Sequence, residues 1–206
     1  METMGTETIG AIKEKIVWAS KILFERGLIE VYDGNVSYRF SEEYYIITPS
    51  HMAKNALTID DLVVVYFNDR WINVKGLKPS VEYKMHKLIY QRFKEVKAVV
   101  HAHNPYVVAL TEIIPNIDEA LLEASGETKY YIPDGISIVP RLPPGSLELA
   151  KAVAESLKGP NSLAILRGHG VVGVGETIED ALQRVLIAER NAKIVFIESL
   201  FKMALK

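Results

Sequence analysis

The sequence predicts an α/β fold with a mixed or antiparallel central sheet and helices on the faces of that sheet. Segments whose apolar residues recur with helical spacing are interleaved with short segments rich in β-branched residues. Turn signals between neighbouring short segments indicate hairpins, so the strands are not all parallel. With 206 residues, 49% of them hydrophobic, the chain is long and apolar enough for one sizeable core. We therefore expect a single domain spanning residues 1–206.

The first part of the chain is expected to start with a helix of about Thr8–Arg26, because its apolar residues have a 3.6-residue period and Gly27 is a plausible stop. Strands are expected at residues 36–40, 44–48, 62–67, 71–74 and 96–103. A helix is expected to start after Pro79, with Val81 and Met85 on its apolar face.

The second part of the chain continues the alternation of helices and strands. Helices are expected at residues 104–111, 118–124 and 146–157, and strands at residues 137–139, 162–166 and 171–174. Thr177 and Asp180 resemble a capping box and predict the start of a long last helix.

Composition and charge narrow the class of protein. The net charge of −2 gives no electrostatic reason to expect nucleic acid or an anionic membrane as a partner. No apolar run approaches the roughly 20 residues of a membrane span, and the polar, acidic segment Met1–Gly10 is unlike a signal peptide. We therefore expect a cytoplasmic protein. The chain has no cysteine, so any zinc must be bound by His, Asp or Glu.

Two histidines close the expected strand at residues 96–103. His101 and His103 are one residue apart, so their side chains share one face of the strand and lie roughly 6.5–7 Å apart. Two imidazoles at this spacing can converge on one cation about 2.1 Å from each nitrogen. The alternative interpretation is a strand end with two ordinary polar residues, but two histidines on one face favour a metal site.

Two further residues are candidates for the same site. His169 follows an apolar strand and lies between Gly168 and Gly170, which leave room for a close approach, although a tight turn would also explain the glycines. Glu82 is expected in the first turn of a helix, where the exposed amides alone would favour a carboxylate. Three histidines and one carboxylate are typical of an open, catalytic zinc site. His86, one turn after Glu82, either orients it or is a core histidine.

Three turns offer groups for an anion. Residues 33–37 supply glycine, amide and hydroxyl groups, and residues 48–51 supply hydroxyl groups. Residues 78–80 precede a helix, whose N-terminal amides favour a phosphate. Each segment is also explained as an ordinary turn or helix cap.

Taken in order, these segments resemble the class II aldolase/adducin family, and among its members the pattern is most similar to the L-fuculose-phosphate aldolases. The motifs that carry the resemblance are Gly34-Asn35-x-Ser37, Thr48-Pro49-Ser50, Pro79-Ser80-x-Glu82, His101-x-His103 and Gly168-His169-Gly170. The resemblance covers about residues 10–200, and its specific parts are the paired histidines and the Pro-Ser-x-Glu segment.

The resemblance implies a three-layer α/β/α domain with a largely antiparallel sheet, and a homotetramer with sites between subunits. It implies Zn²⁺, or another divalent metal, bound by three histidines, with Glu82 as the acid/base and as a fourth ligand when substrate is absent. It implies phosphate binding by four further residues. The metal ligands would be His101, His103 and His169, and the phosphate-binding residues Gly34, Asn35, Ser50 and Ser80.

The reaction implied is cleavage of a small ketose 1-phosphate, similar to fuculose 1-phosphate, to dihydroxyacetone phosphate and an aldehyde by way of a metal-stabilised enediolate. The chain departs from the family at two positions near the phosphate: Val81 stands where a second serine is common, and His51 where glycine is common. Lys78 is a candidate replacement cation. The segment 117–120 also lacks the tyrosine with which some aldolases protonate the leaving aldehyde.

Other functions remain open on the same residues. A ribulose-5-phosphate 4-epimerase of this family would carry aspartate at the acid/base position, so Glu82 favours the aldolase. A sugar-phosphate dehydratase is a further enzyme alternative. A non-catalytic, adducin-like binding module would be expected to lose metal ligands, and this chain retains all of its candidates.

Overall fold

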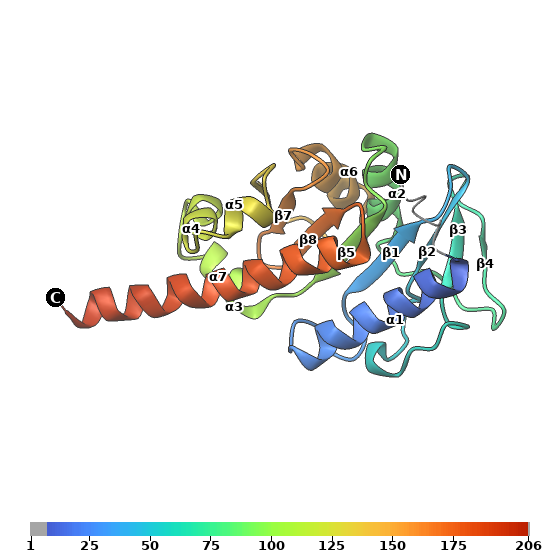
Figure 1. Ribbon diagram of the computed structural model, residues 1–206, viewed down its shortest axis with the longest axis horizontal. Coiled ribbons are helices and arrows are strands. Elements are labelled where there is room, and N and C mark those ends of the chain that lie inside the picture. The colour runs from blue at the N-terminus through green and yellow to red at the C-terminus, as the bar shows by residue number, and fades with distance from the viewer. Residues whose placement is uncertain (1–7, 206) are drawn as a thin grey trace, which may run out of the picture.

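The computed structural model describes residues 8–205, and its centre is one eight-stranded sheet in the order β4-β3-β2-β1-β5-β8-β7-β6 (Figure 1). Neighbouring strands are antiparallel except for the parallel pair β6 and β7. The strands are β1 (Asn35–Arg39), β2 (Tyr44–Ile47), β3 (Val63–Tyr66), β4 (Trp71–Ile72), β5 (Ala98–Ala102), β6 (Ile136–Val139), β7 (Leu163–Leu166) and β8 (Gly170–Gly175). The expected largely antiparallel sheet is therefore confirmed.

Helices cover both faces of the sheet and complete three layers. The helices are α1 (Ile9–Glu25), α2 (Tyr83–Arg92), α3 (Pro105–Thr111), α4 (Ile117–Glu123), α5 (Thr128–Tyr131), α6 (Leu147–Ser156) and α7 (Ile178–Ala204), with the 3₁₀ turn η1 (Lys54–Ala56). One buried apolar cluster joins α1, α3, α4 and α7 to one face of the sheet, and another joins α2 and α6 to the opposite face.

Local sequence accounts for the ends of the longest helices. Thr8 caps α1 by accepting a hydrogen bond from the Ala11 amide, and Gly27 follows the helix with φ +66°. Thr177 caps α7 by accepting from the Asp180 amide, as the capping pattern predicts. The turn η1 and the short helix α5 have no clear periodic signal and were not expected. The acidic start of the chain lies mostly outside the described residues.

The expected start of α2 was wrong in a way that matters for the site. The helix begins at Tyr83 rather than directly after Pro79, so Val81 is 61% exposed and lies outside the apolar face. The segment before it is held extended, because the Ser50 amide donates to the Lys78 carbonyl and the Ser80 amide donates to the Thr48 carbonyl. Tertiary pairing between these two segments therefore delays the helix.

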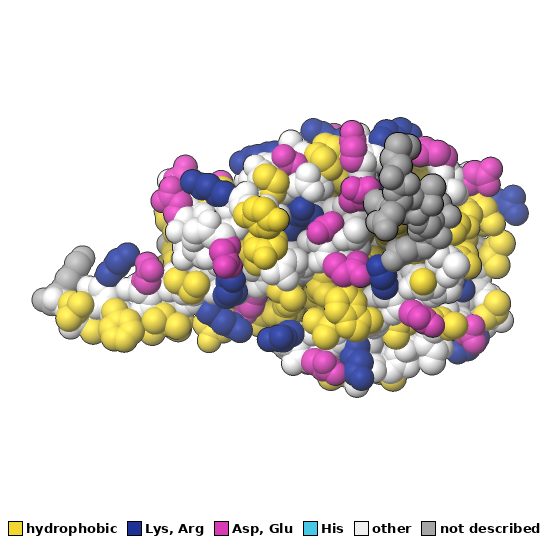
Figure 2. All heavy atoms as spheres, in the orientation of Figure 1, with side chains coloured by type: hydrophobic (Ala, Val, Ile, Leu, Met, Phe, Trp, Pro, Cys, Tyr) yellow, Lys and Arg dark blue, Asp and Glu magenta, His cyan; other side chains and the backbone are white. Residues whose placement is uncertain are grey.

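The end of α7 projects past the body of the domain and carries exposed apolar side chains along one side (Figures 1 and 2). The exposed apolar residues of this segment are Phe196, Ile197, Leu200, Phe201, Met203 and Leu205. Apolar area of this extent on a helix is typical of a surface that contacts another chain. No helix within residues 8–205 is long and apolar enough to cross a membrane.

Candidate active site

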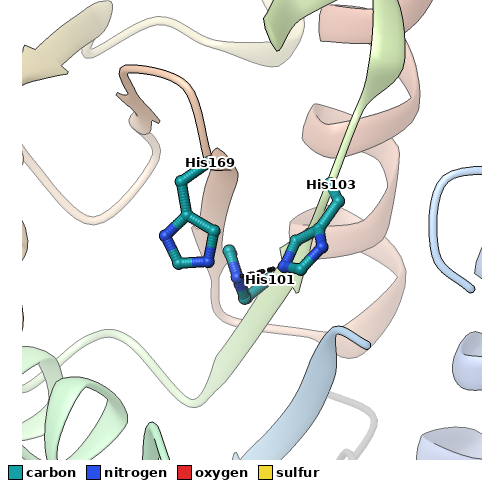
Figure 3. A group of neighbouring side chains, drawn as sticks. All are labelled: His101, His103 and His169. Atoms are coloured by element: carbon teal, nitrogen blue, oxygen red, sulfur yellow. Dashed lines mark hydrogen bonds between the residues drawn. The ribbon is translucent and has the colours of Figure 1, made fainter. Parts of the chain in front are cut away.

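Three histidines converge where β5 meets β8 (Figure 3). His101 is fully buried on β5, His103 follows the end of that strand, and His169 lies in the turn between β7 and β8. Because His101 pairs with Val172 across the sheet, the turn that carries His169 is brought beside the paired histidines. The candidate ligand atoms lie within 4.8 Å of one another, and the Nε2 atoms of His101 and His103 are 3.2 Å apart.

The glycines on either side of His169 are required by the backbone. A Cβ atom at Gly170 would lie 2.1 Å from the carbonyl oxygen of Ala102, so only glycine lets β8 approach β5 here. Gly168 has φ +63°, a conformation that side chains disfavour. The Gly-His-Gly motif is thus explained by the close approach that brings His169 to the other two histidines.

The Glu82 carboxylate completes this group. Its Oε2 lies 3.2 Å from His101 Nε2 and its Oε1 lies 3.8 Å from His169 Nε2. Glu82 occupies the N-cap position of α2, one residue before the expected first turn, and its side chain makes no capping bond. Oε1 is buried and has no hydrogen-bond partner among residues 8–205, which leaves an anionic oxygen facing the histidines.

Hydrogen bonds orient two of the rings so that Nε2 faces the centre of the group. His101 Nδ1 donates to the Val171 carbonyl at 2.9 Å, and His103 Nδ1 lies 3.4 Å from Asp33 Oδ2. Partners of this kind on the outer nitrogen are what hold metal-binding imidazoles in the correct tautomer. The Nε2 lone pairs of both rings are therefore available at the centre of the group.

A buried chain of hydrogen bonds fixes the orientation of the Glu82 carboxylate. The Asn35 amide nitrogen donates to Glu82 Oε2 at 3.0 Å, so the Asn35 carbonyl oxygen accepts from His86 Nε2. His86 Nδ1 then accepts from the Ser37 hydroxyl at 2.6 Å, and Ser37 in turn pairs with the Tyr90 hydroxyl at 2.6 Å. His86 consequently acts on Glu82 through Asn35.

The protonation states suit a divalent cation. Burial lowers the pKa values of His101 and His169, and it lowers the pKa of His103 to about 4, so all three rings are neutral at pH 7. Burial opposes ionisation of Glu82, but at acid pH, where the neighbouring histidines become protonated, their charge and the bond from Asn35 outweigh it and lower the pKa of Glu82 to about 2, so the carboxylate is ionised at pH 7. Three neutral imidazoles and one carboxylate form a donor set that fits zinc or a similar ion.

A pocket of about 260 Å³ opens beside this group. The four residues expected to bind phosphate all line it: Gly34, Asn35, Ser50 and Ser80. His103, His169 and Glu82 line the same pocket. Both side-chain polar atoms of Asn35 are engaged by Glu82 and His86. The structure thus brings together the metal-ligand, acid/base and phosphate-binding candidates from the sequence, whereas Lys78, the candidate replacement cation, is exposed and does not line the pocket.

Two loops carry the pocket residues into place. Gly34 has φ +64°, and a Cβ atom there would lie 2.4 Å from the Ile29 side chain and 2.9 Å from the His101 carbonyl oxygen. His51 also has a positive φ, of +54°, at the position where the family commonly has glycine. The histidine therefore keeps the backbone shape that glycine would provide, and its side chain lines the pocket.

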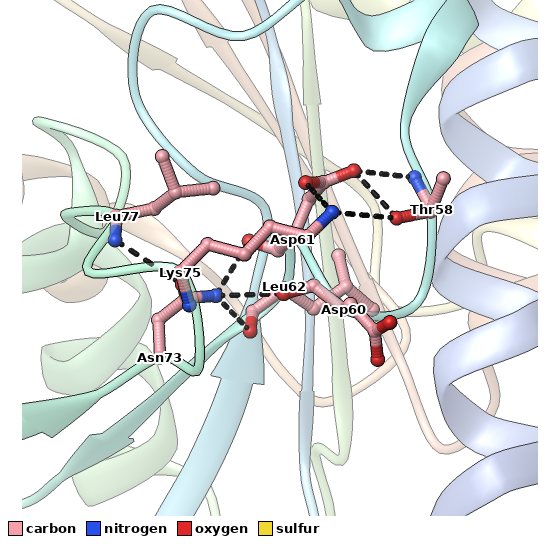
Figure 4. A network of polar contacts seen from close by, with 7 residues as sticks. All are labelled: Thr58, Asp60, Asp61, Leu62, Asn73, Lys75 and Leu77. Atoms are coloured by element: carbon pink, nitrogen blue, oxygen red, sulfur yellow. Dashed lines mark hydrogen bonds and ion pairs between the residues drawn. The ribbon is translucent and has the colours of Figure 1, made fainter.

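The segment that leads to Ser80 is anchored by Asn73 (Figure 4). The Asn73 amide nitrogen donates to the carbonyl oxygens of residues 60, 61 and 62, and its oxygen accepts from the amides of residues 75 and 77. Asp61 accepts from the Thr58 hydroxyl and pairs with Lys75 at 2.8 Å. This network holds the chain between β4 and the pocket.

Two pocket residues were not recognised from the sequence. Asp33 was noted as part of a turn, and its contact with His103 depends on the pairing of β1 with β5. Lys54 is 2% exposed and lines the pocket, although lysine is ordinarily a surface residue. Neither role has a sequence signal, because each arises from segments that only the fold brings together.

The fold and this site define a class of protein: α/β enzymes in which histidines at strand ends and a glutamate form a potential metal centre beside a pocket. Residues 14–196 match the family model described as Class II Aldolase and Adducin N-terminal domain, and the chain belongs to this family. It is therefore a class II, aldolase-type enzyme of a metal-dependent family.

Individual relatives point to more than one reaction. An L-fuculose phosphate aldolase of Methanococcus maripaludis is 33% identical over 177 residues, which cover 86% of this chain and 92% of that protein. A 3-oxo-tetronate 4-phosphate decarboxylase of Haemophilus influenzae is 30% identical over 190 residues, covering 90% and 87%. The structure of a sugar-phosphate aldolase from Thermotoga maritima superposes with a TM-score of 0.82 at 26% identity, covering 92% and 95% of the two chains.

Proposed function

We propose that this chain is a zinc-dependent aldolase that cleaves a small ketose 1-phosphate, similar to fuculose 1-phosphate, into dihydroxyacetone phosphate and an aldehyde. The observation that carries the proposal is the convergence of three histidines and Glu82 at one pocket. His101, His103 and His169 would hold the metal, with Glu82 as a fourth ligand when substrate is absent. Zinc, or another divalent cation, would polarise the substrate carbonyl as a Lewis acid.

Glu82 is the acid/base of this proposal. Its ionised carboxylate is suited to take the proton that must leave the substrate for the carbon–carbon bond to break, and to return it to the carbon of dihydroxyacetone phosphate. The bond from Asn35 at 3.0 Å restricts the carboxylate to one orientation beside the histidines. His86 supports that orientation, because its Nε2 donates to the Asn35 oxygen.

The substrate phosphate is proposed to bind in the same pocket, beside the histidine group. The candidate phosphate ligands are Gly34, Asn35, Ser50 and Ser80, which line one cavity. Ser80 lies just before α2, where the positive end of the helix dipole favours an anion. Val81, the next residue, has no hydroxyl group with which to bind the phosphate.

A decarboxylase acting on a 3-oxo sugar-acid phosphate is the second candidate function. It is favoured by the relative of that name, whose match covers 90% of this chain. Both reactions break a carbon–carbon bond next to a carbonyl group and leave an electron pair that a Lewis acid stabilises.

The decisive test is a parallel assay of the metal-loaded protein. Fuculose 1-phosphate is assayed for dihydroxyacetone phosphate, a 3-oxo-tetronate 4-phosphate for carbon dioxide, and ribulose 5-phosphate for epimerisation. Cleavage of the first substrate at the highest kcat/KM supports the aldolase. Carbon dioxide release without any cleavage would replace the aldolase with the decarboxylase.

The metal is tested separately from the reaction. Wild-type protein is expected to retain one divalent ion per chain by elemental analysis, and His101→Ala is expected to lose it. His51→Ala is a matched control, because His51 lines the pocket but lies outside the group of three histidines. Equal metal content in all three proteins would contradict the assigned ligands.

We propose further that the chain is a cytoplasmic enzyme that assembles as a homotetramer. The exposed apolar end of α7 supports assembly, because it leaves six large apolar residues uncovered in one chain. Light scattering of the purified protein is expected to give four times the 23.1 kDa mass of one chain. A monomeric mass at micromolar concentration would contradict the tetramer.

A further inference from the structure

Lys54 is a buried cation in the wall of the pocket. It begins η1, and its side chain is 2% exposed. Its Nζ donates to three backbone carbonyl oxygens, those of Tyr32 at 3.3 Å, Pro49 at 3.3 Å and Met52 at 3.1 Å. All three of its N–H donors are therefore used, and the ammonium group ties together the two loops that carry Gly34 and Ser50.

The surroundings of Lys54 leave its charge uncompensated. Within residues 8–205 no carboxylate lies within ion-pair distance of its Nζ, and Asp33 is the acidic group whose charge acts on it. Helix α1 packs against η1, and the buried side chains of that helix are uncharged. The other titratable groups that line the pocket are His51, Glu82, His103 and His169.

Burying an ammonium group without a paired carboxylate costs free energy, and an anion bound nearby offsets that cost. Burial lowers the pKa of Lys54 to about 8, because the ammonium loses its contact with water and gains no paired carboxylate. Charges in a buried wall are screened less than surface charges, so this cation acts strongly on an anion in the same pocket. A lysine on the exposed surface would not have this effect, because water would screen its charge.

We propose that Lys54 is a positioning residue that makes this pocket selective for a dianionic end of the substrate, such as a phosphate monoester. Lys54 acts without touching the substrate: it holds the loops of Gly34 and Ser50 together and supplies the positive charge behind them. This proposal rests on the proposed function in one respect only, which is that the substrate phosphate binds in this pocket. It applies equally to cleavage and to decarboxylation, because both substrates carry a phosphate.

Protonation of Lys54 and binding of the anion are linked. The dianion stabilises the ammonium form, so affinity is highest while Lys54 is protonated and falls as the pH rises through about 8. A phosphate monoester, whose second pKa is about 6, stays dianionic throughout this range, and so does sulfate. Loss of affinity above pH 8 must then come from the protein.

The experiment is calorimetric titration of the zinc-loaded protein with glycerol 1-phosphate, a phosphate monoester, and with sulfate between pH 7 and pH 9.5. For the wild type we expect both affinities to fall about tenfold across this range, the effect of a pKa that binding raises by one unit. Lys54→Met should bind about tenfold more weakly at pH 7 and show no dependence on pH. Circular dichroism and metal content check that each variant is folded and loaded.

Two further variants keep the test decisive even if Lys54→Met does not fold. Lys54→Arg retains a cation that stays protonated above pH 12, so it should bind as the wild type does at pH 7 and keep that affinity at pH 9.5. Lys78→Met removes an exposed lysine beside the same loops and should leave the wild-type pH dependence unchanged.

Several outcomes would overturn the proposal. They are a fall in affinity above pH 8 that persists in Lys54→Arg, a fall that disappears in Lys78→Met, and binding that is the same in every variant. Anion binding does not depend on turnover, so the two proposals fail separately. Absence of any cleavage with the expected binding pattern rejects the reaction and leaves the role of Lys54 intact.

Discussion

The Asn35 side-chain amide donates a hydrogen bond of 3.0 Å to the Glu82 carboxylate, and this contact joins the central sheet to the start of α2. Asn35 on β1 is paired with His101 on β5. This one strand pair therefore fixes the position of a candidate metal ligand and of the residue that orients the acid/base. The same carboxylate oxygen lies 3.2 Å from His101 Nε2. A displacement of Asn35 is therefore expected to disturb proton transfer and the histidine group together.

Glu82→Gln is expected to keep the fold and most of the metal affinity, because the amide is nearly isosteric with the carboxyl group. We expect kcat to fall by about two to four orders of magnitude, the usual contribution of a general acid or base. Steady-state kinetics with the best substrate checks this, with Glu95→Gln, an exposed glutamate, as the control. A kcat equal to that of the wild type would remove Glu82 from its role.

Asp33→Asn is expected to weaken metal binding. The Asp33 carboxylate lies 3.4 Å from His103 Nδ1, so its loss removes the negative partner that orients this ring and raises its basicity. We expect a decrease in metal affinity of about 10- to 100-fold, measured by competition with a chromogenic chelator. Asp69→Asn, remote from the histidines and paired with Lys87, is the control. Identical affinities in both variants would show that the Asp33 contact is unimportant.

Acid is expected to destabilise the metal-free protein through His86. Burial lowers the pKa of this ring from 6.5 to about 3, so folding favours the neutral form. Its stabilising effect is complete above pH 6.5 and is lost as the pH falls from 6.5 toward 3. At pH 5 this loss amounts to about 2 kcal/mol of unfolding free energy, and the lowered pKa values of His101, His103 and His169 act in the same direction.

Urea denaturation of the metal-free protein at pH 7 and pH 5 checks the contribution of His86. His86→Gln should be less stable than the wild type at pH 7 but should lose less stability on acidification. His51→Gln, which changes a pocket histidine with an exposed side chain, should retain the wild-type difference. If His86→Gln showed the same pH dependence as the wild type, the titration would have to be assigned to other groups.

Gly34→Ala is expected to be strongly destabilising. The new Cβ would lie 2.4 Å from the Ile29 side chain, and the residue would have to keep φ +64°. We expect a loss of about 3 kcal/mol, the sum of overpacking and left-handed strain. Gly76→Ala is the matched control: it has φ +72° but no atom within 4 Å, so it should lose only about 1 kcal/mol. Chemical denaturation of both variants measures the difference, and equal losses would exclude the packing contribution.

Local patterns in the sequence were enough to predict most elements of the fold and to nominate the residues of the site. Apolar periodicity located α1, α6 and α7, and β-branched segments located the central strands, because local spacing decides which face of an element is buried. The alternation of side chains predicted that His101 and His103 lie on one side, and the two rings do meet at the end of β5.

The way in which these groups are held depends on contacts between segments that are far apart in the sequence. Pairing of the 48–50 segment with the 78–80 segment delays α2 and turns Glu82 toward the histidines instead of the helix amides. Lys54 reaches carbonyl groups up to 22 residues away, and His86 acts on Glu82 through Asn35, 51 residues distant in the chain. Such contacts have no local signature, because hydrogen bonds and burial between remote segments depend on the packing of the whole domain.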